Sequence, residues 1–174
     1  DENLRKFYYN LTVLDEIDYA ESGNEKVYEN FIQKHLKSDK VNLFSNERFT
    51  SVLFSFDNIR SKALRLKTIF PKGKIMVLIR SQLDIVMSQY RDHPFDPRCL
   101  RIGKSVSLDD WIKIAFCNKW IKYPNSLKYY EVISIYVELF GKENVSVFLF
   151  EELASNPHAF GDKVSRFLGI SPEM

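Results

Sequence analysis

Residues 74–90 read KIMVLIRSQLDIVMSQY, and this stretch decides the fold class. Its first part, Lys74 to Ile79, is almost entirely apolar, which is typical of a strand buried on both faces of a parallel sheet. The apolar run stops at Arg80, and from Leu83 to Tyr90 the apolar residues follow helical spacing. The stretch therefore predicts a buried strand that leads directly into a helix, with an arginine at the junction.

The same alternation of short apolar runs and helical spacing continues on both sides of this stretch. The predicted strands cover 40–44, 74–79 and 144–150, and the predicted helices cover about 26–36, 57–70, 83–90, 107–116, 125–140 and 156–170. The first 25 residues show no sustained period, so their structure stays open. Apolar strands that alternate with helices indicate an α/β fold, in which a parallel sheet carries helices on both faces.

Composition limits the classes of function. The chain has 174 residues, of which 45% are hydrophobic, enough for a single domain with one sizeable core. A net charge of +2 gives no indication of bulk binding to nucleic acid, and no apolar run is long enough to span a bilayer. The three histidines and two cysteines lack metal-ligand spacing, so we expect no metal site. Whether Cys99 and Cys117 pair stays open.

The junction at Arg80 predicts a site for a compact anion. Ligands of open parallel sheets lie beyond the carboxyl ends of the strands, and the start of the following helix offers amide donors and a positive dipole. Ser88 could add a hydroxyl to the same site. The alternative is purely structural: Ser81 caps the helix together with Asp84, and Arg80 pairs with an acid at the surface.

The segment with Arg80, Asp84, Ser88 and Tyr90 resembles the 3′-phosphate-binding segment of sulfotransferases that use 3′-phosphoadenosine 5′-phosphosulfate (PAPS). Many members have Asn-Pro after this arginine, where the present chain has Ser-Gln. The resemblance implies that Arg80 and Ser88 bind the 3′-phosphate of the donor. A guanidinium suits this role because its planar fork grips two phosphate oxygens at once.

Two further segments resemble the same family in the same order. Residues 139–170 are similar to the late strand, acidic turn and final helix of these enzymes, and residues 42–49, NLFSNERF, are similar to the strand that delivers the catalytic base. Phe150 stands where several relatives carry a tyrosine near the nucleotide, and we expect it to pack first and to contact the donor second. The bacterial carbohydrate-type members look closest.

Within 42–49 the resemblance makes Glu47 the candidate catalytic base. A glutamate at the carboxyl end of a strand, partly desolvated under the acceptor, could take the proton of the acceptor hydroxyl. The alternative is a solvated glutamate paired with Arg48 or Arg60. The sequence does not decide between these two roles.

One part of the family pattern has no counterpart in this sequence. The resemblance implies a fold like that of P-loop NTPases, with a glycine-rich donor loop after the first strand, and no such segment is present. We therefore expect the fold to be incomplete at its N-terminus, by truncation or by disorder. The chain would form one sulfotransferase-like domain over 1–174, with a helical acceptor-side region at 1–39 and a recognisable core at 40–170.

The resemblance implies transfer of a sulfuryl group from PAPS to a hydroxyl acceptor, with a carbohydrate as the expected acceptor and no metal or nucleic acid involved. The basic loop at 92–106 would border an acidic sugar. Two alternatives stay open: a kinase-like phosphotransferase, and a non-catalytic remnant of the fold that binds a nucleotide or a partner. The oligomeric state is open, and the bacterial cytoplasm is the expected location, with the Golgi lumen as the alternative.

Overall fold

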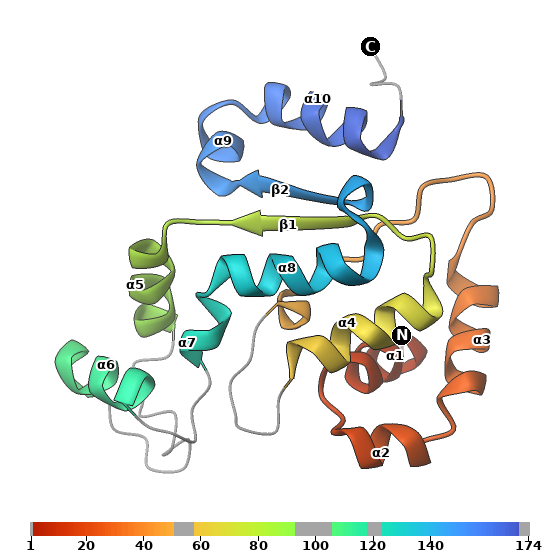
Figure 1. Ribbon diagram of the computed structural model, residues 1–174, viewed down its shortest axis with the longest axis horizontal. Coiled ribbons are helices and arrows are strands. Elements are labelled where there is room, and N and C mark those ends of the chain that lie inside the picture. The colour runs from red at the N-terminus through yellow and green to blue at the C-terminus, as the bar shows by residue number, and fades with distance from the viewer. Residues whose placement is uncertain (1, 51–57, 93–105, 118–122, 171–174) are drawn as a thin grey trace.

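Helices dominate the computed structural model, which describes residues 2–50, 58–92, 106–117 and 123–170 (Figure 1). The elements, in chain order, are α1 (Glu2–Thr12), α2 (Glu16–Glu21), α3 (Asn24–His35), the 3-10 turn η1 (Glu47–Phe49), α4 (Ile59–Ile69), β1 (Ile75–Ile79), α5 (Gln82–Asp92), α6 (Leu108–Cys117), α7 (Tyr123–Ser126), α8 (Tyr129–Phe140), the 3-10 turn η2 (Lys142–Asn144), β2 (Val145–Leu149), α9 (Phe150–Ser155) and α10 (Pro157–Leu168). The predicted helices are confirmed except that one is divided, and two of the three predicted strands are confirmed.

The two strands form a parallel sheet, as predicted. β1 and β2 pair in register from Ile75 opposite Val145 onward, and both strands point the same way in Figure 1. α8 packs against one face of this sheet. On the other face, Phe148 contacts the rings of Phe160 and Phe167 on α10. The predicted arrangement, a parallel sheet with helices on both faces, is therefore confirmed for the described residues.

The strand predicted at 40–44 is wrong. This segment is a loop, and the side chain of Asn42 holds it in place by accepting a hydrogen bond from the Lys37 N–H at 3.0 Å and donating one to the Lys37 carbonyl at 2.8 Å. Val41 and Leu43 are exposed. A short apolar run becomes a strand only where a neighbouring strand takes its backbone hydrogen bonds. Here the side chain of Asn42 instead bonds the backbone of Lys37 and the carbonyl of Lys40, which forms a turn.

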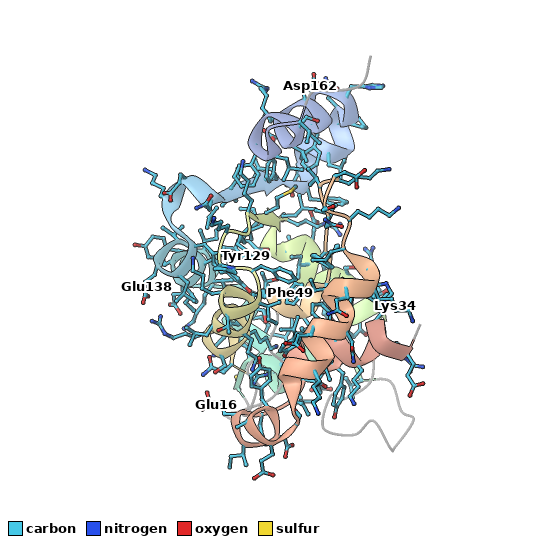
Figure 2. All side chains as sticks on the ribbon, turned by 90° about the vertical axis from the view of Figure 1, so that its right-hand side faces the viewer. Glu16, Lys34, Phe49, Tyr129, Glu138 and Asp162 are labelled. Atoms are coloured by element: carbon cyan, nitrogen blue, oxygen red, sulfur yellow. The ribbon has the colours of Figure 1, made fainter. Side chains whose placement is uncertain are left out.

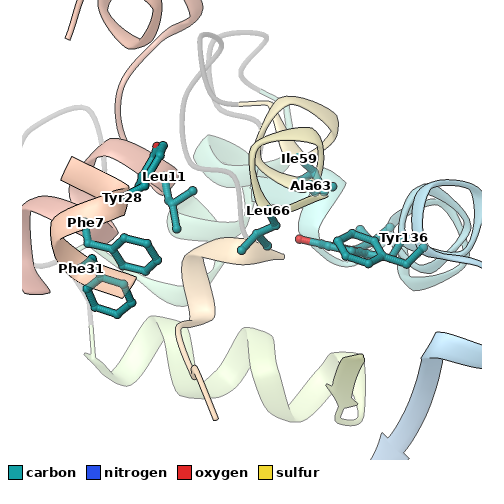
Figure 3. Close-up of a cluster of buried hydrophobic side chains, with 10 residues drawn as sticks. Phe7, Leu11, Tyr28, Phe31, Ile59, Ala63, Leu66 and Tyr136 are labelled. Atoms are coloured by element: carbon teal, nitrogen blue, oxygen red, sulfur yellow. The ribbon is translucent and has the colours of Figure 1, made fainter. Parts of the chain in front are cut away.

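The main hydrophobic core lies between the N-terminal helices and α4 and α8 (Figure 3). Phe7 of α1 and Phe31 of α3 are almost fully buried, and their rings stack with centroids 3.7 Å apart. From the opposite side of the core, α8 contributes Tyr136, and α4 contributes Ala63 and Leu66. Within the first 25 residues, which the sequence left open, lie α1, α2 and the start of α3, and α1 supplies a large share of the core.

α4 carries two buried cations, Arg65 and Lys62, which donate hydrogen bonds to backbone carbonyls of other segments. The Arg65 guanidinium donates to the carbonyls of Asn10 at 3.2 Å, Leu14 at 2.8 Å and Asp15 at 3.1 Å, so it closes the carboxyl end of α1. The Lys62 ammonium donates to the Arg48 carbonyl in η1 at 3.1 Å. Buried charges need such hydrogen bonds because desolvation is otherwise costly.

Two predicted helix ends are confirmed, and one predicted helix is divided. Ser107 Oγ accepts from the Asp110 N–H at 3.2 Å before α6, and Gly141 ends α8 with a φ of 88°. The helix predicted over 125–140 is interrupted between α7 and α8. No helix in the described ranges is long and apolar enough to cross a membrane.

Candidate anion site at the ends of the two strands

The carboxyl ends of β1 and β2 lie side by side because the strands are parallel and Ile79 pairs with Leu149. The residues that follow each strand therefore meet at one edge of the sheet. Arg80 follows β1, and Phe150 and Glu151 follow β2. This edge is where ligands of open parallel sheets bind.

Arg80 and Phe150, two of the residues that the sequence singled out, are in contact. The Arg80 guanidinium carbon lies 4.9 Å from the centroid of the Phe150 ring, within the range of a cation–π interaction. Arg80 is half-buried, and 36% of Phe150 is exposed. Phe150 thus contacts Arg80, and its role beside the donor stays a prediction.

Glu151 binds the start of α5 from the neighbouring strand. Its carboxylate accepts a hydrogen bond from the Ser81 backbone N–H at 2.8 Å. This bond, together with the charge of Arg80, lowers the pKa of Glu151 from its ordinary value. The site therefore already brings a carboxylate to the first amide that follows Arg80.

Tyr129, the first residue of α8, fixes the backbone of Arg80. Its hydroxyl donates to the Arg80 carbonyl at 2.7 Å. Burial raises the pKa of Tyr129 from its ordinary value of 10.0. In the view of Figure 2, Tyr129 lies in the middle of the picture, whereas Glu16, Lys34 and Glu138 lie at its edges.

Further contacts hold the beginning of α5. Ser81 Oγ accepts from the Asp84 N–H at the long distance of 3.5 Å, and the Gln82 amide donates to the Leu127 carbonyl at 2.7 Å. The capping contact of the structural alternative is thus present, but weak. An arginine, a helix start and fixed backbone amides together make a site that can bind a compact anion.

Ser88 lies further along α5 and is half-buried. It belongs to the same strand–helix unit as Arg80, and the described contacts do not join the two side chains. Its role as a second phosphate ligand stays a prediction.

Glu47 is the first residue of η1, and it is exposed. Two long-range hydrogen bonds fix this turn: the Tyr136 hydroxyl donates to the Phe49 carbonyl at 2.6 Å, and Lys62 holds the Arg48 carbonyl. The described contacts do not join Glu47 to the strand ends, so its catalytic role stays a prediction.

The structural alternative for Glu47 included a pair with Arg60. The Arg60 guanidinium instead binds both carboxylate oxygens of Glu138 on α8. This contact lowers the pKa of Glu138 and raises that of Arg60. The strongest contact of Arg60 therefore links α4 to α8.

A shallow apolar groove of about 390 Å³ opens beside the junction, lined by α5, the end of α6 and the residues between α7 and α8. Leu83, Phe116 and Leu127 supply apolar side chains, and Lys128 adds a cation at the rim. Because Leu83 lies in the first turn of α5, the groove begins next to Arg80 and Ser81.

Sequence reasoning missed Tyr129 and Glu151 as members of the site. Glu151 carries a partial signal, because an acid directly after an apolar strand lies at the ligand edge of a parallel sheet. Tyr129 carries none, because its contact with Arg80 depends on how α8 packs against β1. The loop at 92–106 falls largely outside the described residues, and so does Cys99, while Cys117 is exposed. The described part of the chain holds no cluster of metal-binding side chains.

No protein-family model matches this chain, and no curated protein matches it in sequence. Among solved structures, the chain is similar to the crystal structure of a sulfotransferase from Alicyclobacillus acidocaldarius, with a TM-score of 0.70 and 18% sequence identity. The match covers 95% of this chain and 69% of that chain. The likeness shows a sulfotransferase-like fold, in agreement with the fold expected from the sequence.

Proposed function

We propose that this chain is a sulfotransferase that moves a sulfuryl group from PAPS to a hydroxyl acceptor. The observation that carries the proposal is the position of Arg80. It follows β1 at the ligand edge of the sheet, directly before the start of α5, and Tyr129 holds its backbone. A sulfotransferase-like fold with an arginine at this point supports binding of the 3′-phosphate of the donor.

Each proposed residue has one role in this reaction. Arg80 and Ser88 bind the 3′-phosphate, and Phe150 packs beside the guanidinium and borders the nucleotide. Glu47 accepts the proton of the acceptor hydroxyl. At the same time the oxygen of that hydroxyl forms a bond to sulfur, and the bond between sulfur and the 5′-phosphate oxygen of the donor breaks. The products are the sulfate ester and 3′-phosphoadenosine 5′-phosphate. No step of this mechanism requires a metal.

The acceptor that we propose is a carbohydrate. The groove beside the junction, with Lys128 at its rim, offers apolar surface for the nonpolar face of a sugar ring and a cation for an acidic substituent. A location in the bacterial cytoplasm remains part of the same proposal.

The sequence lacks the glycine-rich loop with which the family holds the 5′-phosphosulfate, and such a loop belongs to the P-loop-NTPase-like arrangement that we propose. Turnover would need that loop in addition to residues 1–174. Binding of the 3′-phosphate is therefore the part of the function that this chain can show alone. A chain that binds nucleotide without turnover is the second candidate, and the lack of the loop is the observation that favours it.

Isothermal titration calorimetry tests the proposal. The chain should bind 3′-phosphoadenosine 5′-phosphate more tightly than adenosine 5′-phosphate, which lacks the 3′-phosphate. Arg80→Ala should remove ~2 kcal/mol or more of the binding free energy of the first ligand, as expected for charge-assisted hydrogen bonds, and should barely affect the second. The matched control is Arg91→Ala: Arg91 is an exposed arginine in the last turn of α5, the helix that follows Arg80, and this variant should bind normally.

Equal losses for both nucleotides in Arg80→Ala would contradict the assignment, because the arginine would then not recognise the 3′-phosphate. Transfer of labelled sulfate from PAPS to a panel of sugars and phenols, in a chain that includes a donor loop, separates an enzyme from a nucleotide-binding remnant. Transfer of the γ-phosphate of ATP instead would favour the kinase-like alternative.

A further inference from the structure

Glu151 occupies a backbone donor that an anion would use at the start of α5. The Ser81 N–H is the first amide after Arg80, and it donates to the Glu151 carboxylate at 2.8 Å. The Arg80 guanidinium also attracts this carboxylate and contributes to its lowered pKa. The groups best suited to bind an anionic ligand, Arg80 and the Ser81 N–H, therefore already interact with a carboxylate of the protein itself, that of Glu151.

We propose that Glu151 competes with the anionic ligand for this site and so sets its affinity. The identity of the ligand, the 3′-phosphate of the donor, rests on the function proposed above. The competition itself rests only on the contact between Glu151 and Ser81. This competition predicts that the protein binds anions more weakly than it would if Arg80 and the start of α5 acted without Glu151.

Two physical reasons support competition. An amide N–H has one hydrogen, so a ligand oxygen can take the Ser81 donor fully only after the carboxylate releases it. A carboxylate that stays in place instead repels a phosphate bound to Arg80, because both carry negative charge. Glu151 is exposed, so its side chain has room to turn toward solvent when a ligand arrives.

The neighbouring acid provides a matched control. Glu152 lies on the same turn of α9, but its carboxylate pairs with Lys163 of α10 at 2.7 Å. Its contact therefore lies on α10 and not at the start of α5. A change of charge at Glu152 has the same effect on net charge as one at Glu151 without freeing the Ser81 amide.

The first experiment uses inorganic pyrophosphate and needs no nucleotide. The Ser81 amide resonance is followed by ¹⁵N NMR in the wild type, Glu151→Gln and Glu152→Gln. Glutamine keeps an oxygen that can accept from Ser81, but it removes the charge. In Glu151→Gln the midpoint of the titration should lie at a pyrophosphate concentration at least roughly threefold lower than in the wild type. This difference between the two midpoints should become smaller at high salt. Glu152→Gln should match the wild type.

The second experiment repeats the comparison with 3′-phosphoadenosine 5′-phosphate and includes Glu151→Ala, which removes the acceptor as well as the charge. Both Glu151 variants should bind more tightly than the wild type. Unchanged or weaker binding of pyrophosphate in Glu151→Gln would overturn the proposal. Weaker binding in Glu151→Ala would also overturn it, because the carboxylate would then position the turn for the ligand.

Failure of the proposed function gives a different pattern. If Arg80→Ala did not change the preference for the 3′-phosphorylated nucleotide, the donor assignment would be wrong. The pyrophosphate titration would still decide whether Glu151 competes for the Ser81 amide, because it does not depend on which anion is the natural ligand.

Discussion

At the scale of single residues, the site combines side chains whose roles differ in strength. The Arg80 guanidinium is charged and contacts the Phe150 ring, and the Tyr129 hydroxyl holds the Arg80 carbonyl. Replacing Arg80 should therefore weaken ligand binding more than replacing any other residue of the proposed site. Ser88 offers one neutral hydroxyl on a helix that forms without it. Glu47, the base of the proposed reaction, lies on an anchored turn. These differences give distinct expectations for each residue.

Replacing Ser88 with alanine should weaken binding of 3′-phosphoadenosine 5′-phosphate by ~1 kcal/mol, because a single neutral hydrogen bond is lost. The melting temperature should not fall, since alanine is the stronger helix former. Calorimetry and thermal unfolding check both expectations, with Ser165→Ala on α10 as the control. A variant that binds normally but melts at a different temperature would show that Ser88 serves packing only.

Replacing Glu47 with glutamine should lower turnover by roughly 10² in a chain that carries a donor loop, because glutamine keeps the shape but cannot accept the proton. The affinity for 3′-phosphoadenosine 5′-phosphate should not change, since this residue lies outside the proposed phosphate site. Single-turnover sulfation measures the first quantity and calorimetry the second. Glu21→Gln, an exposed acid on α2, is the control, and full turnover in Glu47→Gln would exclude the residue as the base.

At the scale of elements, α4 is the helix that connects the N-terminal helices to the sheet-covering helix α8. Its buried Arg65 binds three carbonyls and lies 4.0 Å from the centroid of the Tyr19 ring. Its exposed Arg60 binds Glu138 of α8. The two arginines thus allow a comparison of a buried and a surface cation within one helix.

Arg65→Met should destabilise the fold by ~3 kcal/mol, because the carbonyls that end α1 would lose charged donors in a desolvated position. Arg60→Met should cost much less stability than Arg65→Met, because an ion pair in solvent contributes little. Urea denaturation of the two variants and the wild type gives both values. Similar costs for both variants would show that burial does not govern the contribution of Arg65.

At the scale of the whole molecule, several buried tyrosines make the fold sensitive to alkaline pH. Burial raises the pKa of Tyr136 well above its ordinary value of 10.0, and the pKa of Tyr28 is also raised, with burial as the largest cause. In the unfolded chain these hydroxyls ionise near their ordinary pKa. Their stabilising contribution is therefore fully present below about pH 10 and is lost as the pH rises toward the folded-state pKa.

The free energy of unfolding of the wild type should consequently fall above about pH 10, by up to about 1.4 kcal/mol per pH unit for each fully buried tyrosine. Tyr136→Phe should be less stable at pH 8, because the Phe49 carbonyl loses its donor, but it should lose less stability between pH 8 and pH 10.5 than the wild type does. Urea unfolding at the two pH values gives the comparison. An identical loss in both proteins would mean that Tyr136 does not titrate as its burial requires.

The sequence by itself determined the features that depend on residues close to one another along the chain. Apolar runs and helical spacing predicted both strands, most helices and the parallel arrangement, and the end of β1 placed Arg80 at the ligand edge. Tertiary structure alone decided which groups meet Arg80 there: Glu151 is 70 residues from Ser81, and Tyr129 is 49 residues from Arg80. It also decided against a strand at 40–44, because a strand forms only where another backbone accepts and donates its hydrogen bonds, and no local pattern encodes that partner.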